Sequence, residues 1–273
     1  PLDEKLDALR QILGNLQRLV VAYSGGVDSS LLAKVAYDTL GDQAVAVTAV
    51  SASLAAEELE EATTIAARIG VRHELIETRE LERSDYRRND RMRCFYCKVE
   101  LFDRLREYAK ANDISHMVYG PVVDDLGDFR PGMAASRQRG ARAPMVEAGL
   151  RKADVRQLAL QFGLPTWDKP ALPCLSSRFP YGISISPEKL SVVDRGEEIL
   201  RDFGFKVFRV RYHESLVRLE FSPKELPKAL NVTMSAILNK RFKSLGFKFV
   251  TVDLEGYRSG SLNEVLPLHP SQD

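Results

Sequence analysis

The sequence has no long hydrophobic run and no excess of charge of one sign. No apolar stretch approaches the roughly 18 residues that span a bilayer, and residues 1–15 lack the apolar centre of a secretory signal. With 39 Lys and Arg against 38 Asp and Glu, the formal net charge is +1. This balance argues against a uniform nucleic-acid-binding surface. We therefore expect a cytoplasmic protein that does not act at a membrane and whose partner is not nucleic acid.

Short apolar runs alternate with helical patterns through the first 165 residues. The composition, 44% hydrophobic and 28% charged, is ordinary for a globular protein. Strands alternating with helices predict an α/β fold with a doubly wound parallel sheet. The predicted strands are 18–23, 44–50, 71–76 and 117–119, and the predicted helices are 28–40, 57–69, 99–112 and 153–162.

The pattern changes after Pro170. A helix over 187–203, two strands over 206–212 and 216–221, a mainly helical stretch over 223–245 and a strand over 247–254 are expected. This order predicts a smaller α+β domain. The domain boundaries are placed at 1–170 and 171–273.

The familiar nucleotide-binding motifs are missing. There is no Gly-x-x-x-x-Gly-Lys-Ser/Thr run and no Gly-x-Gly-x-x-Gly at the first strand–helix turn. That turn instead reads YSGGVDSS over 23–30. Gly25 and Gly26 let the backbone approach a ligand closely, and helix amides face an anion there. The polar side chains expected beside the anion are Ser24, Ser29, Ser30 and Asp28, the last of them through a bridging Mg²⁺.

The run resembles the SGGxDS signature of the PP-loop ATP pyrophosphatases. The resemblance implies that ATP is cleaved between its α and β phosphates, that the loop binds pyrophosphate and that a substrate is adenylated. A Ser-Gly-rich turn that only joins strand to helix is the structural alternative.

The chain has only three cysteines, Cys94, Cys97 and Cys174. Three thiolates can hold a [4Fe–4S] cluster and leave one iron for an external ligand such as sulfide. A structural zinc normally needs four protein ligands, and no fourth is evident. Half-buried thiols without function and a Cys94–Cys97 redox disulfide remain alternatives. Placed at a helix start, Cys97 is expected to have a lowered pKa.

Four further runs resemble the LarE-type sulfur transferases, in the same order over nearly the whole chain. They are GDFRPG (127–132), SSRFPYG (176–182), VRYH (210–213) and DLEGYRSG (253–260). These proteins act in nickel-pincer nucleotide biosynthesis, converting the carboxylates of pyridinium-3,5-biscarboxylic acid mononucleotide into thiocarboxylates. The resemblance implies that a carboxylate attacks the α-phosphate of ATP and that sulfur then displaces AMP. It also implies a homo-oligomer, with substrate binding and assembly assigned to the C-terminal domain.

Cys174 matches the reactive cysteine of this family. In better-known members that cysteine stands alone and gives up its own sulfur. Because Cys94 and Cys97 are also present here, the resemblance implies the iron–sulfur variety, in which a cluster-bound sulfide is delivered. A protein that resupplies sulfur is then a candidate partner, and sacrifice of Cys174 remains the alternative.

Several charged residues are candidates for binding anions. The guanidinium of Arg178 suits a substrate carboxylate or phosphate. Arg209 and Arg211 share one face of a strand and suit the substrate phosphate, unless that face is merely exposed. Asp128 and Arg130 are candidate contacts to metal and phosphate. Competing functions are a tRNA thiolase, an ammonia-using ligase and a non-catalytic nucleotide-binding redox sensor.

Overall fold

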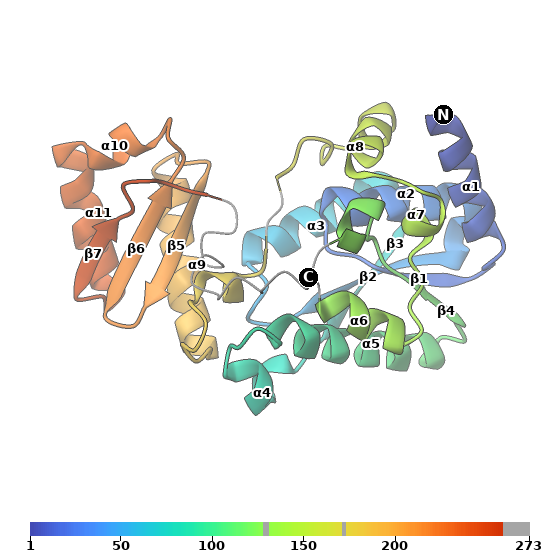
Figure 1. Cartoon of the computed structure of the whole chain (residues 1–273), viewed down its shortest axis with the longest axis horizontal. Helices are drawn as coiled ribbons and strands as arrows, with labels where there is room; N and C mark the ends of the chain where they lie inside the picture. Colours follow the sequence, from blue (N-terminus) through green and yellow to red (C-terminus); the bar gives the residue numbers. More distant parts are fainter. Residues whose placement is uncertain (128–130, 171–172, 259–273) are drawn as a thin grey trace, which may run out of the picture. The chain divides into compact units, whose positions relative to one another are not determined.

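The β-branched runs of the first 120 residues form one parallel sheet in the computed structural model (Figure 1). The structure describes residues 1–127, 131–170 and 173–258. The sheet has the order β3-β2-β1-β4 and is built from β1 (Leu19–Ala22), β2 (Ala44–Val50), β3 (Arg72–Glu77) and β4 (His116–Val118). The chain steps outward from β1 to β3 and then returns to the other side of β1. The predicted doubly wound sheet is confirmed, and ligands of such sheets bind where the strand order reverses, here between β1 and β4.

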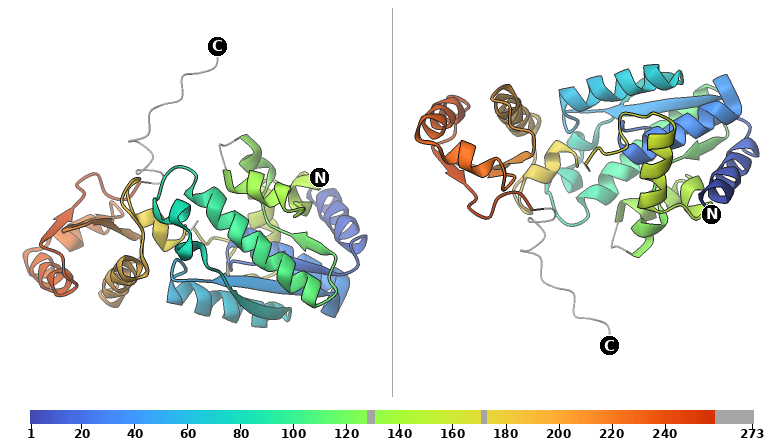
Figure 2. Two further views of the ribbon diagram at one scale, coloured as in Figure 1. Left: turned by 90° about the horizontal axis from the view of Figure 1, so that it is seen from below. Right: turned by 90° about the horizontal axis from the view of Figure 1, so that it is seen from above.

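Helices cover both faces of this sheet (Figures 1 and 2). One face carries α1 (Leu2–Gly14), α2 (Val27–Leu40), α3 (Ala56–Ile69) and α8 (Lys152–Gln161). The other carries α5 (Arg93–Ala111), against which α6 (Pro131–Gln138) packs. The view from below in Figure 2 shows α5 in front of the sheet.

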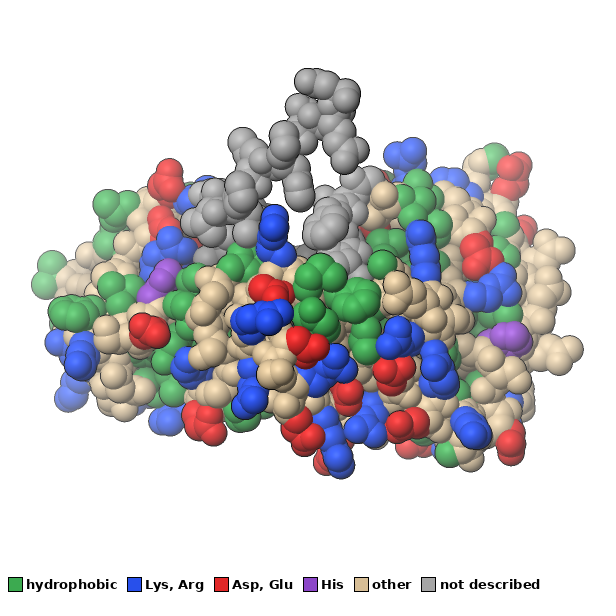
Figure 3. All heavy atoms as spheres, turned by 60° about the horizontal axis from the view of Figure 1, so that its bottom comes forward, with side chains coloured by type: hydrophobic (Ala, Val, Ile, Leu, Met, Phe, Trp, Pro, Cys, Tyr) green, Lys and Arg blue, Asp and Glu red, His purple; other side chains and the backbone are tan. Residues whose placement is uncertain are grey.

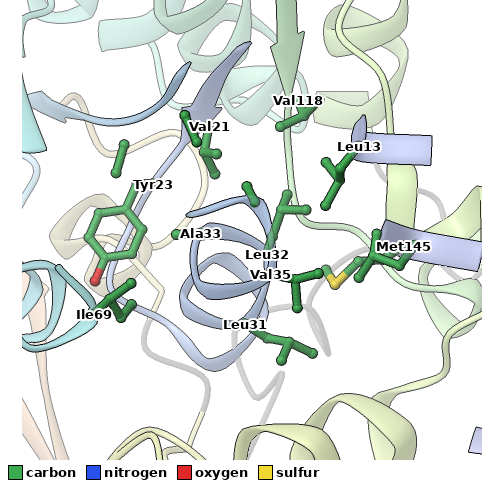
Figure 4. Close-up of a cluster of buried hydrophobic side chains, with 14 of the residues drawn as sticks. Leu13, Val21, Tyr23, Leu31, Leu32, Ala33, Val35, Ile69, Val118 and Met145 are labelled. Atoms are coloured by element: carbon green, nitrogen blue, oxygen red, sulfur yellow. The ribbon is translucent and has the colours of Figure 1, made fainter. Parts of the chain in front are cut away.

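Alternate residues of β1 enter two different cores. Val21 joins the cluster formed with α2 and α1, including Leu32 and Leu13 (Figure 4). Val20 joins the opposite cluster with Phe102 of α5. Burial on both faces explains why the strand has no polar alternation.

Helix α5 begins six residues before the predicted start. It includes Cys94 and Cys97, which were expected just ahead of it. Met92 precedes the helix and provides no side-chain cap, so the usual start signal is missing. The short elements between the main ones are η1 (Gly41–Gln43), η2 (Glu80–Glu82), α4 (Ser84–Arg87), η3 (Val123–Gly127), α7 (Pro144–Glu147) and η4 (Leu175–Arg178).

A second, small sheet lies in the C-terminal part and confirms the predicted α+β portion. Strands β5 (Phe208–His213) and β6 (Leu216–Phe221) pair antiparallel, and β7 (Phe249–Val252) joins β6 in parallel. The helices that accompany it are α9 (Pro187–Asp202), α10 (Leu226–Leu230) and α11 (Val232–Ser244).

Two compact units divide the chain. Unit 1 contains residues 1–86 and 92–174, and unit 2 contains residues 87–91 and those from 175 onward. The short segment 87–91 is held in unit 2 by Asn89, whose side-chain amide donates to the carbonyl oxygens of Pro180 (2.8 Å) and Ile183 (3.0 Å). The SSRFPYG run thus contributes to the fold, because the carbonyl group of its Pro180 binds the side chain of Asn89.

Acidic and basic side chains are mixed on the face drawn in Figure 3. Within the described ranges, no helix combines the length and the apolar character needed to cross a membrane.

A buried ion pair anchors η4 to α9 in unit 2. Arg178 donates from Nε and Nη2 to the two carboxylate oxygens of Glu197, at 2.8 and 3.0 Å. Both side chains are at most 5% exposed. Removing one partner of such a pair leaves a buried charge uncompensated.

Glu197→Gln should therefore lower the free energy of unfolding by about 3–5 kcal/mol, measured by urea denaturation. Glu198→Gln is the matched control, because Glu198 is the exposed neighbour on the same helix and should change stability by less than about 0.5 kcal/mol. Equal effects of the two changes would contradict the assignment.

Candidate active site

The turn from β1 into α2 requires glycine at position 25. Gly25 has φ +70°, and a Cβ there would lie 2.7 Å from Cβ of Ala62 and 2.8 Å from its Cα. Tyr23 fixes the same contact, since its hydroxyl donates to the Ala62 carbonyl at 3.1 Å. Burial raises the pKa of Tyr23 to about 12, so this hydroxyl stays protonated. The loop is thereby pressed against α3.

The loop serines differ in exposure: Ser24 is exposed, whereas Ser29 and Ser30 are buried. Ser29 Oγ lies 3.1 Å from Ser24 Oγ and accepts from the Ser24 amide at 3.2 Å. Ser30 is fully buried, and Ser29 is only 6% exposed. Gly26 precedes α2 without any side-chain cap, so no side chain of its own competes with an anion for the first amides of the helix. The contacts of Ser24, Gly26, Ser29 and Ser30 with phosphate stay predictions.

The end of β4 closes the other side of the loop. A Cβ at Gly120 would lie 3.3 Å from the carbonyl carbon of Asp28 and from the amide nitrogen of Ser29. The point where the strand order reverses thus coincides with the start of α2, as expected for a ligand site at a switch point.

Asp28 has a lysine as its partner. Lys152 Nζ donates to both carboxylate oxygens, at 2.7 and 2.6 Å. The amide of Lys152 donates to Asp124 at 2.8 Å, so Asp124 fixes the start of α8. The partly buried carboxylate of Asp28 suits Mg²⁺ chemically, and a magnesium ion would share it with Lys152 or replace that lysine.

A second lysine reaches the loop from the segment after α8. Lys169 Nζ lies 2.7 Å from Glu61 Oε2 and 3.5 Å from the carbonyl oxygen of Gly25. Sequence reasoning missed Lys152 and Lys169, which are 124 and 144 residues from their loop partners. The available signal was indirect: a phosphate loop without Lys or Arg needs cations from elsewhere.

The three thiols lie close enough in unit 1 to influence one another. Burial and the neighbouring Cys174 raise the pKa of the Cys97 thiol to about 12, with a smaller contribution from Cys94. The predicted lowering is therefore wrong. Cys97 lies beyond the first turn of α5, and like-charged neighbours with burial outweigh the helix N-terminus.

Three cysteines that form no disulfide are a suitable donor set for an iron–sulfur cluster, in which each thiolate binds its own iron. Cys94 is exposed, whereas Cys97 and Cys174 are partly buried. In the part of the chain that the structure describes, no three His, Cys, Asp or Glu side chains are grouped so that they could hold a metal ion. The thiols suit an iron–sulfur cluster by the chemistry of their sulfur atoms, and the cluster itself stays a prediction.

A buried carboxylate lies beside this group. Glu80, 2% exposed, accepts hydrogen bonds through Oε1 from the hydroxyls of Ser51 (2.5 Å) and Ser53 (2.9 Å). Its charge adds to the factors that raise the pKa of Cys97. Ser51 and Ser53 directly follow β2, so this network is at the same sheet edge as the phosphate loop.

Buried arginines line one face of the small sheet in unit 2. Arg209 and Arg211 are 7% and 6% exposed, so the alternative of an exposed strand face is wrong. Arg211 pairs with Glu220 at 2.8 Å. Among the described residues, Arg209 has no carboxylate within 4 Å, and its guanidinium lies 4.7 Å from the centre of the Tyr257 ring. Burial and then nearby Arg178 lower the pKa of Arg209.

The arginines predicted to bind the substrate differ in their partners. Arg178 is engaged by Glu197, and its contact with substrate stays a prediction. Asp128 and Arg130 lie outside the described residues.

Comparison with known proteins agrees with this geometry. Residues 4–167 match the NAD synthase family. The pyridinium-3,5-bisthiocarboxylic acid mononucleotide synthase of Lactiplantibacillus plantarum is 36% identical over 93% of this chain and 92% of its own. The chain belongs to the LarE-type sulfur transferase family.

Other relatives of this LarE-type protein differ in coverage. An uncharacterized protein of Synechocystis is 49% identical over 97% of this chain and 99% of its own. The tRNA-specific 2-thiouridylase of Azorhizobium caulinodans is 30% identical, but the match covers only 56% of this chain and 49% of that protein. The LarE-type chain is thus an ATP-using sulfurtransferase, and the likeness to tRNA-modifying enzymes covers only part of its length.

Gly25→Ala should displace the phosphate loop and weaken ATP binding by at least about tenfold, because the added methyl group would overlap the backbone of Ala62. Gly163→Ala is the control: Gly163 also has positive φ (+66°), but nothing lies within 4 Å of its added Cβ. Calorimetric titration with an ATP analogue that cannot be cleaved between the α and β phosphates measures both. Unchanged binding by Gly25→Ala would show that the loop tolerates a side chain.

Lys152→Met should weaken binding of the same analogue by about tenfold, the effect of losing one hydrogen bond to a charged group. Lys110→Met, an exposed change on α5, should bind as the wild type does. If Lys152→Met binds ATP normally, Lys152 only balances the charge of Asp28.

Proposed function

We propose that this enzyme adenylates the carboxylates of pyridinium-3,5-biscarboxylic acid mononucleotide and converts them to thiocarboxylates, as a step in making the nickel-pincer nucleotide. The observation that carries the proposal is the presence, in one unit, of a glycine phosphate loop at the switch point and three cysteines that form no disulfide. The activity for which the L. plantarum relative is named supports the choice of substrate.

The first half-reaction needs the chain to stabilise departing pyrophosphate. An ionised carboxylate has no usable leaving group, and attack on the α-phosphate of ATP provides one. The α2 amides and the ammonium groups of Lys152 and Lys169 would bind the pyrophosphate, since both lysines contact residues of the phosphate loop. Mg²⁺ held by Asp28 would supply further neutralising charge. When ATP binds, the ammonium group of Lys152 would leave Asp28 and bind phosphate instead.

The substrate carries a phosphate of its own, for which Arg209 and Arg211 are the proposed contacts. Arg209 is buried and has no carboxylate partner in the described part of the chain, so an anion would balance its charge. Arg211 already shares Glu220 with Arg218 and would act as the secondary contact. The predicted contacts of Asp128 and Arg130 with metal and phosphate are part of the same proposal.

The second half-reaction needs a sulfur donor. Cys94, Cys97 and Cys174 are the proposed ligands of a [4Fe–4S] cluster. When bound, the cluster would supply sulfur as sulfide on the iron that no cysteine holds. The raised pKa of Cys97 keeps its thiol protonated without metal, so this residue is a poor nucleophile by itself. Cys174 as a sacrificial donor is the second candidate, since that position matches the reactive cysteine of the family.

An RNA substrate is less well supported. The likeness to the tRNA thiouridylase covers about half of each chain, and the formal charge is +1. Mixed charge on the face in Figure 3 also differs from the basic surface that RNA binding favours. The domain boundaries at 1–170 and 171–273, the homo-oligomeric state, the cytoplasmic location and a sulfur-supplying partner protein stay predictions.

The proposal is tested by two measurements on the same protein. Anaerobic reconstitution should give about four irons and four sulfides per chain, and Cys94→Ala should lose most of this iron. Pyrophosphate and AMP should form from ATP only when the dicarboxylate nucleotide is present.

Each negative result has a separate meaning. A wild-type protein that stays iron-free but forms thiocarboxylate once would identify Cys174 as donor, detectable as loss of the mass of H₂S from the chain. Release of pyrophosphate with unmodified tRNA, and not with the nucleotide, would overturn the proposed substrate.

A further inference from the structure

One arginine of the basic stretch before the first cysteine differs from the others. Arg87, Arg88 and Arg91 are exposed, and Arg88 pairs with Asp90 at 2.7 Å. Arg93 is only 8% exposed. It opens α5, directly before Cys94. A long cationic side chain is seldom buried without a charged group for it to meet.

One group that Arg93 meets is the Cys94 thiol of the cysteine site. Its Nη2 lies 3.9 Å from Cys94 Sγ, within reach of a hydrogen bond to sulfur. A guanidinium stays protonated in proteins, so Arg93 is a permanent cation beside Cys94. Cys174 also interacts with its charge.

The remaining charges around the site are arranged differently. Cys97 is influenced by the buried carboxylate of Glu80 and by Lys98. The side chain of Lys98 is only partly buried, so solvent screens its charge. Arg93, by contrast, is a buried cation whose charge interacts with Cys174 and Cys94.

The position of Arg93 matters if the three cysteines hold the proposed [4Fe–4S] cluster. Three thiolates and an added sulfide bring more negative charge than a [4Fe–4S] core carries positive charge. Nearby cations and hydrogen bonds to the sulfurs stabilise the reduced form of such a centre and raise its reduction potential.

We propose that Arg93 is a positioning residue of the sulfur-transfer site, donating a hydrogen bond to the Cys94 thiolate and balancing the negative charge of the bound cluster and its sulfide. The inference rests on the proposed function. It assigns to this side chain both retention of the cluster and control of its reduction potential.

The test uses the full chain, reconstituted anaerobically with iron and sulfide. Arg93→Met removes the charge and the donor but keeps apolar length, whereas Arg93→Lys keeps the charge. Arg91→Met is the matched control, since it removes an exposed arginine two residues away. The readouts are the midpoint potential from a titration followed by electron paramagnetic resonance, and the rate at which a chelator removes iron.

Arg93→Met should shift the midpoint potential to a more negative value and release iron at least about tenfold faster, the effect of losing a partner next to a metal ligand. Arg93→Lys should recover most of the potential, and Arg91→Met should match the wild type. If circular dichroism shows that Arg93→Met does not fold, Arg93→Lys becomes the deciding variant. A midpoint potential of Arg93→Lys far from that of the wild type would then contradict a charge effect.

The outcomes separate the two ideas. If the wild type binds iron, and its midpoint potential and rate of iron release equal those of Arg93→Met, only the role of Arg93 is overturned. A wild type that takes up no iron overturns the cluster, and this role of Arg93 with it.

Discussion

All four strands of the main sheet are parallel, and therefore all end at the same edge. The phosphate loop follows β1, Ser51 and Ser53 follow β2, Glu80 follows β3 and Gly120 follows β4. Residues spread over nearly one hundred positions of the sequence thus lie at one edge of the sheet, although no local motif links them. The glycines at positions 25 and 120 matter because this edge is crowded: each sits where a side chain would meet backbone atoms.

The charges at this edge occur in opposed pairs. Lys152 meets Asp28, and Lys169 meets Glu61. The protein therefore avoids a concentration of uncompensated charge, which would cost stability. In the proposed function, a nucleotide would gain access to the lysines by competing with carboxylates, so its binding would be an exchange of partners rather than the filling of a bare cationic site. Such exchange favours highly charged ligands over weakly charged ones.

The sequence was sufficient for the sheet and the phosphate loop, because β-branched runs and paired glycines are local signals. It was insufficient where the decisive contacts are distant. Lys152 and Lys169 could not be found, since ion pairs across more than one hundred residues leave no periodic pattern. The start of α5 was placed too late because Met92 gives no capping signal. The pKa of Cys97 was predicted in the wrong direction because burial and the proximity of Cys174 are tertiary properties.

The excursion of residues 87–91 into unit 2 has a consequence for synthesis on the ribosome. Asn89 emerges 91 to 94 residues before the carbonyl groups of Pro180 and Ile183 that bind its side chain. At about 5–20 residues per second, the nascent chain waits roughly 5–20 s with this segment unpaired. Cys174 is the last residue of unit 1 and the last thiol to be made. A cofactor held by all three thiols is therefore inserted after nearly the whole of unit 1 exists, and cannot guide its early folding.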